Sequence, residues 1–243
     1  MVTLSDAQGS PKPLIALIDS DFLVYSIGFA SADATEKIAK ARLTEWLTDI
    51  VYMNLECDDY KAYITGKGNF RYDVAVTVPY KGNRKDAVKP PYYLELREHL
   101  RRLGAVETEG EEADDAVGIE SNKADYWIVH VDKDLDQLPG WHYNPKKDLQ
   151  YFVSDDEGLK NFYTQMLVGD RVDNIVGLKG IGPVKAAKIL KDAVTEQELY
   201  KAVVEAYEAA NEPPERVLEN ARLLWLRRTE GELWQPPVKV NVS

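Results

Sequence analysis

The chain has little cysteine and no long apolar run. Cys57 is the only cysteine among 243 residues, so an internal disulfide and a CxxC metal site are both excluded. No stretch of about 18 apolar residues occurs, and the first residues are polar and include proline, unlike a basic region followed by an apolar segment. From these absences we expect a soluble protein that is not exported and works in a reducing cytoplasm, with no membrane partner.

Histidine is also scarce. His99, His130 and His142 are the three histidines, and they lack metal-ligand spacing and a Ser or Cys partner signature. We therefore interpret them as structural residues.

The charges are distributed unevenly. A net charge of −11 argues at first against a polyanionic partner, because nonspecific nucleic-acid binding depends on basic surface. Residues 67–102, however, carry nine basic and four acidic side chains, whereas residues 107–136 carry eleven acidic and two basic ones. One chain therefore holds a basic and an acidic region, and a nucleic-acid partner stays open.

The apolar pattern predicts an α/β fold, as one large domain or one domain with a small helical appendage. Residues 14–18 form a short apolar run that ends at Asp19, which is typical of a buried parallel strand. Residues 20–55 have helical spacing, 60–64 predict a second strand, and 126–131 predict another strand that ends at Asp132. The chain turns helical from about residue 157, with two further helices in the stretch up to about residue 228.

Residues 66–91 contain three glycines, three prolines and many charges, so we expect a mobile loop there. A helix over 92–103 follows. Within the loop, the run Tyr80-Lys81-Gly-Asn-Arg84-Lys85 places cations where they could bind a phosphate and stabilise developing charge. The alternative is an ordinary basic loop.

Acidic side chains gather where predicted strands end. Glu112-Ala-Asp114-Asp115 packs three carboxylates into four residues, a repulsion that persists mainly when cations neutralise it or water solvates it. An acidic helix start on a wet surface is the alternative. Because ligands of open α/β sheets bind at the carboxyl ends of the strands, we expect these acids to lie near Asp19 and Asp132.

A second acidic run, Asp132-Lys-Asp134-Leu-Asp136, directly follows an apolar strand. If the backbone stays extended, alternate side chains share one face. A solvated turn or a calcium loop are the alternatives, although the glycine and the distal Glu of an EF-hand are absent.

The segment from Gly169 to Lys191 joins acids to a glycine-rich basic run. Asp170 and Asp173 are spaced one helical turn apart. The glycines that follow lack the Gly-Lys-Ser/Thr of a P-loop and predict a helix–hairpin–helix, in which backbone N–H groups approach a phosphate. Its lysines suit a grip on a DNA backbone that reads no sequence. They are Lys179, Lys185, Lys188 and Lys191.

In this order, a strand ending in Asp, YKGNR, EADD, DKDLDQL and GDRVDNIVGLKGIGPVKAA, the motifs resemble the 5′-nuclease family. That family includes bacteriophage flap endonucleases and exonucleases and the 5′-nuclease domain of bacterial DNA polymerase I. The resemblance covers roughly residues 14–191. It implies a PIN-like fold with a mostly parallel central sheet, a mobile arch over about 66–104, and a helix–three-turn–helix element.

The resemblance also implies a division of the chain and its activity. Residues 1–156 would form the catalytic domain, and 157–243 a helical DNA-binding region with its helix–hairpin–helix at about 170–191. The implied activity is metal-dependent 5′-3′ exonuclease and flap endonuclease hydrolysis of DNA. The implied substrates are DNA with 5′ ends, flaps or nicks, and RNA in RNA–DNA hybrids, cut by a monomer.

Site residues carry over by position. Two Mg²⁺ ions, with Mn²⁺ able to substitute, would be held by Asp19, Glu112, Asp114, Asp115, Asp132, Asp134, Asp170 and Asp173. Lys81 and Arg84 would act at the scissile phosphate, with Tyr80 and Lys85 on the DNA. The helix–hairpin–helix would bind DNA through Lys179, Gly180, Gly182, Lys185 and Lys188. The same element would also hold a K⁺ ion.

One position departs from the family pattern. Thr65 stands where the family commonly has an Asp shortly before Phe70-Arg71, which puts one outer metal ligand in doubt. Asp73 could restore the missing charge if the loop folds back, or Thr65 could simply pack at the strand end.

Two rival functions remain open: a non-catalytic DNA-binding protein and a PIN-type ribonuclease. The intact acids argue against the first, and the arch and helix–hairpin–helix argue against the second.

Overall fold

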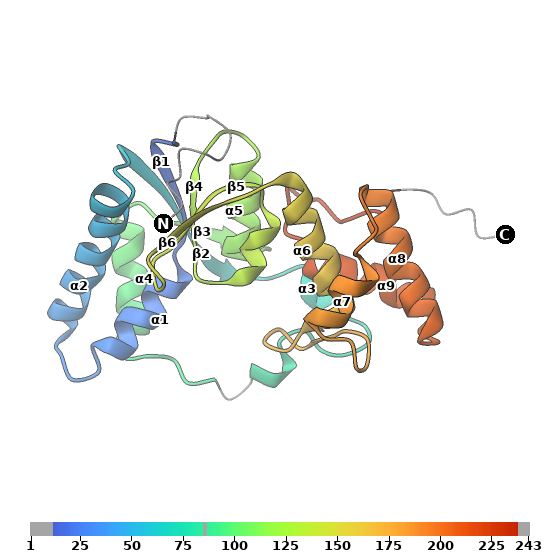
Figure 1. Ribbon diagram of the computed structural model, residues 1–243. Coiled ribbons are helices and arrows are strands. Elements are labelled where there is room, and N and C mark those ends of the chain that lie inside the picture. The colour runs from blue at the N-terminus through green and yellow to red at the C-terminus, as the bar shows by residue number, and fades with distance from the viewer. Residues whose placement is uncertain (1–11, 85–86, 238–243) are drawn as a thin grey trace.

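The computed structural model describes residues 12–84 and 87–237. Its centre is a six-stranded sheet with the order β3-β2-β1-β4-β5-β6 (Figure 1). The strands are β1 (Ile15–Asp19), β2 (Asp59–Lys67), β3 (Val106–Glu109), β4 (Trp127–Val129), β5 (Gly140–Asn144) and β6 (Leu149–Val153). Every neighbouring pair is parallel except β5 and β6. The predicted mostly parallel α/β fold is therefore confirmed.

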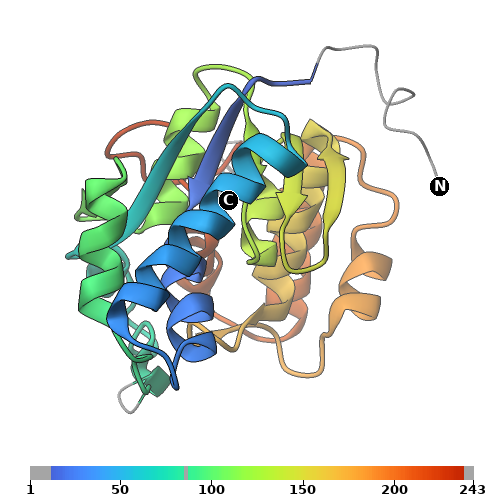
Figure 2. The same ribbon diagram turned by 90° about the vertical axis from the view of Figure 1, so that its left-hand side faces the viewer.

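Helices cover both faces of this sheet because the side chains of β1 alternate between them. Ala16 and Ile18 face a core formed with α1 (Asp21–Ala30), α2 (Glu36–Thr48), the π-helical turn η2 (Asp49–Asn54) and α4 (Tyr93–Arg102). Figure 2 shows the blue helices α1 and α2 in front of the strands. Leu17 faces the other side, where it packs with Val117 of α5 (Ala113–Ser121). The helical stretch expected over 20–55 is thus confirmed, although it consists of several helices.

The second half of the chain builds a helical region with its own core (Figure 1). Its helices are α6 (Asp155–Val168), α7 (Pro183–Ile189), α8 (Glu196–Ala209) and α9 (Pro214–Leu224). Between α6 and α7, the two-residue strands β7 (Gly169–Asp170) and β8 (Ile175–Val176) pair antiparallel. The predicted helices from about residue 157 are confirmed, while the domain boundary at 156 stays a prediction.

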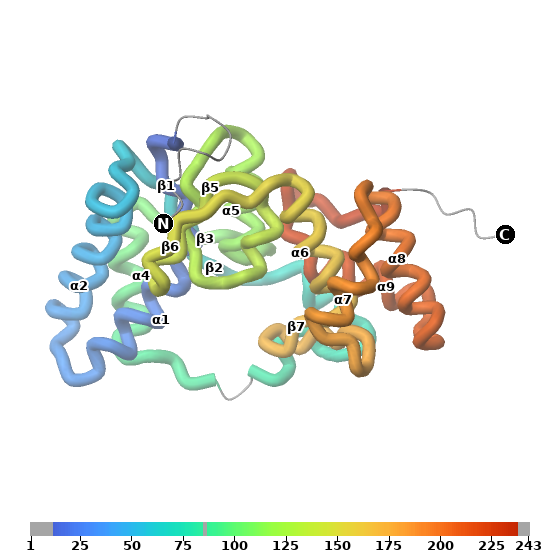
Figure 3. The backbone as a smooth tube through the Cα atoms, in the orientation of Figure 1, coloured from blue at the N-terminus to red at the C-terminus, as the bar shows by residue number. Residues whose placement is uncertain are grey.

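The segment after β2 has more structure than the expected loop. It contains the short helix α3 (Arg71–Val74) and the 3-10 turn η3 (Gly82–Arg84). The tube in Figure 3 shows this segment leaving the sheet, reaching α9 in the helical region and returning to α4. This crossing brings residues from the middle of the chain beside its C-terminal helices.

The β5–β6 hairpin was not predicted. Its strands carry polar residues such as His142, Asn144 and Gln150 among the aromatics, so the apolar pattern is weak. Cys57 is buried and free. Within 12–84 and 87–237, no helix combines the length and apolar character needed to cross a membrane.

Candidate metal centre

A small cleft of about 150 Å³ lies at the carboxyl end of β1. It collects side chains from the starts of α1 and α5, the end of β2, the segment after β4 and the turn between β7 and β8. Its lining residues are Asp19, Asp21, Thr65, Lys81, Arg84, Glu112, Asp114, Asp132, Asp134 and Asp173. Six of the eight acids proposed from the sequence therefore share one cleft, together with both proposed cations.

Burial makes these carboxylates hard to ionise. It raises the pKa of Asp19 to about 8, and the neighbouring charge of Asp21 adds to the effect. It raises the pKa of Asp134 to about 7, with a further contribution from Asp132. The pKa of Asp114 is also raised, first by burial and then by Asp115. Crowded carboxylate oxygens of this kind fit a hard divalent cation, which would supply the missing positive charge.

The 132–136 run is not extended. Residues Lys133–Gln137 form the 3-10 turn η4, and the Asp132 carboxylate accepts a hydrogen bond from the N–H of Asp134 at its start (3.0 Å). Asp132 and Asp134 line the cleft. Asp136 instead accepts a hydrogen bond from the Tyr151 hydroxyl (2.6 Å), so the expectation that all three acids share a face is wrong.

Asp115 does not belong to the cleft. Its carboxylate is fully buried and makes two bonds with the guanidinium of Arg71, one of them 2.9 Å long. Arg71 itself is 2% exposed and also donates to the carbonyl of Leu223 (2.8 Å). Asp115 therefore does not join the other predicted ligands, because its charge is neutralised by a buried partner that ties α3 and α5 to α9.

Asp170 lies beside the cleft and does not line it. Its Oδ1 accepts bonds from the N–H groups of Val172 (2.6 Å) and Asp173 (3.1 Å). This turn replaces the helical spacing expected for the two acids. Lys133 bridges Asp170 (3.3 Å) and Asp134 (3.1 Å), which links Asp170 to the cleft through a cation that the sequence reasoning missed.

Tyr80 is placed differently from its expected role on DNA. Its ring is only 4% exposed, too little for a nucleotide to stack on it. Its hydroxyl lies 2.7 Å from Glu112 and 2.6 Å from Asp173. A hydroxyl has one proton, so one of these carboxyls must itself hold a proton for both contacts to be hydrogen bonds. Burial raises the pKa of Asp173, while Lys81 and the Tyr80 hydroxyl oppose the rise.

Lys81 and Arg84 are held in the cleft by the turn after β7. The N–H of Lys81 donates to the carbonyl of Asp173 (2.9 Å), and Arg84 Nε donates to that of Val172 (2.9 Å). Lys81 also adopts a left-handed backbone with φ of 53°, which is costly for a residue with a Cβ and typical of functional segments. The Lys81 ammonium contacts Glu112, and Arg84 contacts Asp173 at 2.6 Å. Lys85 lies outside the described residues.

Thr65 and Asp21 explain the departure from the family pattern. The N–H of Thr65 donates to Asp21 Oδ2 (3.2 Å), and its hydroxyl accepts a bond from the N–H of Ala113 (2.9 Å). Asp21 thus brings a carboxylate to the place where Thr65 lacks one. Asp73 is exposed on α3 and does not line the cleft. The sequence analysis missed Asp21, although its position two residues after Asp19 could have indicated that it lies in the cleft.

The proposed hairpin residues surround the turn between β8 and α7. Gly180 has φ of 76°, which favours glycine, and Gly182 caps α7 just before Pro183. Lys179, Lys185 and Lys188 are exposed. Lys185 Nζ donates to the carbonyl of Gly180 (2.8 Å). A hollow of about 560 Å³ lies along residues 168–182.

Comparisons with known proteins identify relatives in sequence and in fold. No family model matches the chain. It is 39% identical over 132 residues to DNA polymerase I of Rhizobium leguminosarum, which covers 46% of this chain and 13% of the polymerase. It is 28% identical over 215 residues to a 5′-3′ exonuclease of Mycoplasma genitalium, covering 76% of this chain and 74% of that protein.

Solved structures share the fold. The flap endonuclease of bacteriophage T5, solved with DNA and metal ions, has a TM-score of 0.64 at 18% identity and covers 86% of this chain and 88% of its own. The catalytic core of Rad2, solved with a DNA substrate, has a TM-score of 0.54 at 14% identity and covers 82% of this chain and 66% of its own. The resemblance to the 5′-nuclease family is confirmed. This chain spans 13–25% of the DNA polymerases I first matched, so only one portion of each corresponds to this 5′-nuclease fold.

The neighbouring acids Asp114 and Asp115 provide a matched test of which acids line the cleft and which one is structural. Asp115→Asn leaves the buried charge of Arg71 without its partner and should cost about 3–5 kcal/mol of unfolding free energy. Asp114→Asn removes a carboxyl that is crowded by others, so stability without metal should be unchanged or higher. Urea unfolding of both variants in EDTA measures this difference, and equal losses would contradict the assignment.

The raised carboxyl pKa values predict how stability depends on pH. Above pH 6.5, the ordinary pKa of histidine, the histidines are mostly neutral in both states. From there up to about pH 8, the folded protein binds more carboxyl protons than the unfolded chain. Stability in EDTA should therefore fall as pH rises through this window. Saturating Mg²⁺ should remove the decline, because the cation replaces the protons. Thermal unfolding with and without Mg²⁺ tests this, and a metal-free stability that rises with pH would refute it.

The Asp21 and Thr65 pair predicts a compensation. Asp21→Asn should weaken Mn²⁺ binding by about 10- to 100-fold, as loss of a supporting carboxylate usually does. Thr65→Asp in the same chain should restore much of the affinity, while the exposed control Asp73→Asn should leave it unchanged. Calorimetric titration with Mn²⁺ is the measurement. A loss in Asp73→Asn and none in Asp21→Asn would show that Asp73 has the role.

Proposed function

We propose that this protein is a metal-dependent 5′-3′ exonuclease and flap endonuclease that hydrolyses DNA phosphodiester bonds in replication, repair or phage DNA metabolism. One observation carries the proposal: a cleft of crowded, mostly half-buried carboxylates is also lined by Lys81 and Arg84. Carboxylates alone would repel a phosphate, so the arrangement suits a site in which cations join the two.

The acids of the cleft have the chemistry to hold two Mg²⁺ ions, with Mn²⁺ able to substitute. Mg²⁺ keeps several waters and binds few carboxylates directly, so several of these acids act through water. We assign the ligands to Asp19, Asp21, Glu112, Asp114, Asp132, Asp134 and Asp173, with Asp170 in a supporting position. Two bound ions would activate the attacking water and stabilise the leaving oxygen.

Lys81 and Arg84 provide positive charge for the scissile phosphate. Both now contact carboxylates, Glu112 and Asp173, and phosphate oxygens would take the place of these partners. Glu112 and Asp173 would then be released toward the metal ions. Tyr80, which contacts the same two acids, positions them instead of contacting DNA.

The exposed lysines of the turn and α7 would bind the duplex backbone outside the cleft. Lys179, Lys185 and Lys188 project from a short, glycine-bearing turn, which suits contacts with phosphate instead of bases. A K⁺ ion at this turn would compete with Lys185 for the Gly180 carbonyl. We further propose that the protein acts as a monomer in the cytoplasm, on 5′ ends, flaps and nicks, and on RNA in hybrids.

The rival function, a non-catalytic DNA-binding protein, explains the lysines but not the cleft. Crowded, mutually repelling carboxylates cost stability and repel DNA, so a protein that only binds would gain by losing them. A PIN-type ribonuclease would not need residues 66–91 to reach the helical region.

The function is tested with 5′- and 3′-labelled flap, nicked and blunt duplexes, incubated with Mg²⁺ or EDTA. We expect cleavage near the 5′ end or the flap junction in Mg²⁺ and none in EDTA. Asp134→Asn should abolish most cleavage while DNA binding is retained. Full activity in EDTA, or binding without any cleavage in Mg²⁺ and Mn²⁺, would reject the proposal.

Two sets of lysines should separate chemistry from binding. Lys81→Ala should lower the rate at saturating DNA by about 10²-fold or more, because its charge acts on the transition state. The control, Lys185→Ala with Lys188→Ala, should weaken duplex binding and make its log–log salt slope shallower by roughly 2. Single-turnover rates and binding titrations over a salt series measure both. The assignment fails if Lys81→Ala changes only binding.

A further inference from the structure

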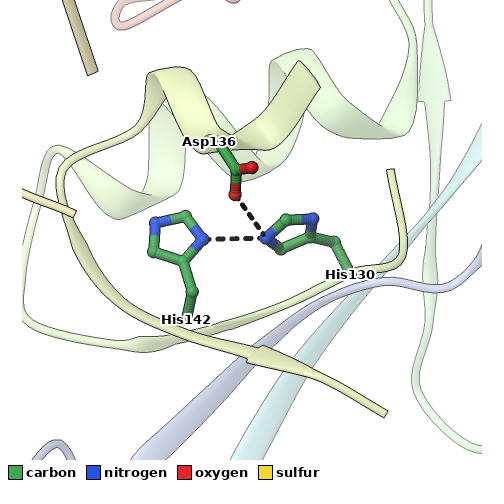
Figure 4. A group of neighbouring side chains, drawn as sticks. All are labelled: His130, Asp136 and His142. Atoms are coloured by element: carbon green, nitrogen blue, oxygen red, sulfur yellow. Dashed lines mark hydrogen bonds and ion pairs between the residues drawn. The ribbon is translucent and has the colours of Figure 1, made fainter. Parts of the chain in front are cut away.

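Two buried histidines outside the carboxylate cleft face each other. His130 follows β4 and His142 lies on β5, and their exposed fractions are 1% and 0%. His130 Nε2 and His142 Nδ1 are 2.8 Å apart (Figure 4). The spacing of the two histidines in the sequence does not indicate this pair, because the pairing of β4 with β5 brings them together.

The other nitrogen of each ring already has a partner. His130 Nδ1 lies 2.5 Å from the carbonyl of Asp132, and His142 Nε2 lies 2.8 Å from the carbonyl of Leu138. A carbonyl only accepts, so both outer nitrogens carry the proton of a neutral ring. The two inner nitrogens then present lone pairs to each other at 2.8 Å, an arrangement that requires a positive centre between them.

A metal ion between the two rings would bind both lone pairs while each imidazole stays neutral. Outer N–H groups that donate to backbone carbonyls are also the usual means of orienting a histidine ligand.

Asp136 offers a third ligand atom beside the two histidines. Its Oδ1 lies 3.8 Å from His130 Nε2, and one donor atom from each of His130, Asp136 and His142 lies within 4.8 Å of the other two (Figure 4). Tyr151 supports this group: its hydroxyl donates to Asp136 (2.6 Å), and its ring stacks on that of His142 with centroids 5.2 Å apart. Asp136 is partly exposed, which leaves a path for an ion.

We propose that His130, His142 and Asp136 form a binding site for one transition-metal ion, separate from the carboxylate cleft, with Zn²⁺ as the best match. Two imidazole nitrogens and one carboxylate suit tetrahedral Zn²⁺ with water or the Tyr151 hydroxyl as the fourth ligand. Mg²⁺ prefers an oxygen-only set such as the cleft. The inner nitrogens need to separate only slightly to admit the ion.

The site would act on the cleft through the chain between the two. His130 precedes η4, and Asp136 lies near the end of that turn, which Asp132 caps and which also carries Asp134. An ion that joins both ends of this turn to β5 would fix the position of two cleft acids. We therefore expect a structural ion at His130, Asp136 and His142, and its binding can be measured without any nuclease assay.

Co²⁺ is the probe, because tetrahedral nitrogen-containing sites give an intense visible absorption that octahedral oxygen sites lack. The full chain is titrated with Co²⁺ in excess Mg²⁺, and Zn²⁺ is then added to displace it. We expect one equivalent of tetrahedral Co²⁺ in the wild type and in Asp134→Asn, where only the cleft is altered. Zn²⁺ should also raise the unfolding temperature of the wild type.

The ligand variants decide the proposal. His142→Gln and the partly exposed Asp136→Asn should both lose the absorption, while His99→Gln, a histidine on α4 that contacts Thr44, should retain it. Circular dichroism identifies any variant that has not folded, and Asp136→Asn serves if His142→Gln fails. The proposal is overturned if the wild type shows no tetrahedral Co²⁺, which would leave a shared proton between the rings, or if both ligand variants keep it.

Discussion

Repulsion among crowded carboxylates is the constraint around which the cleft is organised. The parallel strands bring Asp19 and Asp132 to the same edge of the sheet, and α5 adds Glu112 and Asp114. Folding therefore concentrates negative charge where burial makes it most costly, as the raised pKa values of Asp19, Asp114 and Asp134 record. The rest of the structure must supply enough stability to hold these groups together until cations or substrate-binding residues offset their charge.

The crossing of residues 66–91 toward the helical region supplies part of that stability. Arg71 neutralises Asp115 and ties α5 to α9, so one acid of the EADD motif anchors the helix that presents the other two. Further along, Lys81 and Arg84 are fastened to the turn after β7. The cations of the cleft are thus positioned by the same region whose lysines are proposed to bind duplex DNA, which would couple duplex binding to the arrangement of the site.

Sequence reasoning predicted the fold class, the strands that end in acids, and most of the cleft, because apolar runs and their terminal carboxylates are local patterns. It failed where long-range contacts decide. Nothing near Asp115 in sequence reveals Arg71 as its partner, and the burial of Tyr80 depends on contacts with Glu112 and Asp173. The His130–His142 pair depends on strand register between β4 and β5. Asp21 was within reach, since it follows Asp19 by two residues and Thr65 had left a charge missing.

The central claim is that the acids of the cleft gather to hold divalent cations, and anomalous diffraction tests it most directly. Crystals grown with Mn²⁺ should show two anomalous peaks in the cleft, with ligands drawn from Asp19, Asp21, Glu112, Asp114, Asp132, Asp134 and Asp173, and Asp115 still paired with Arg71. No peak in the cleft at saturating Mn²⁺, or an ion bound by Asp115 with Arg71 displaced, would contradict the account.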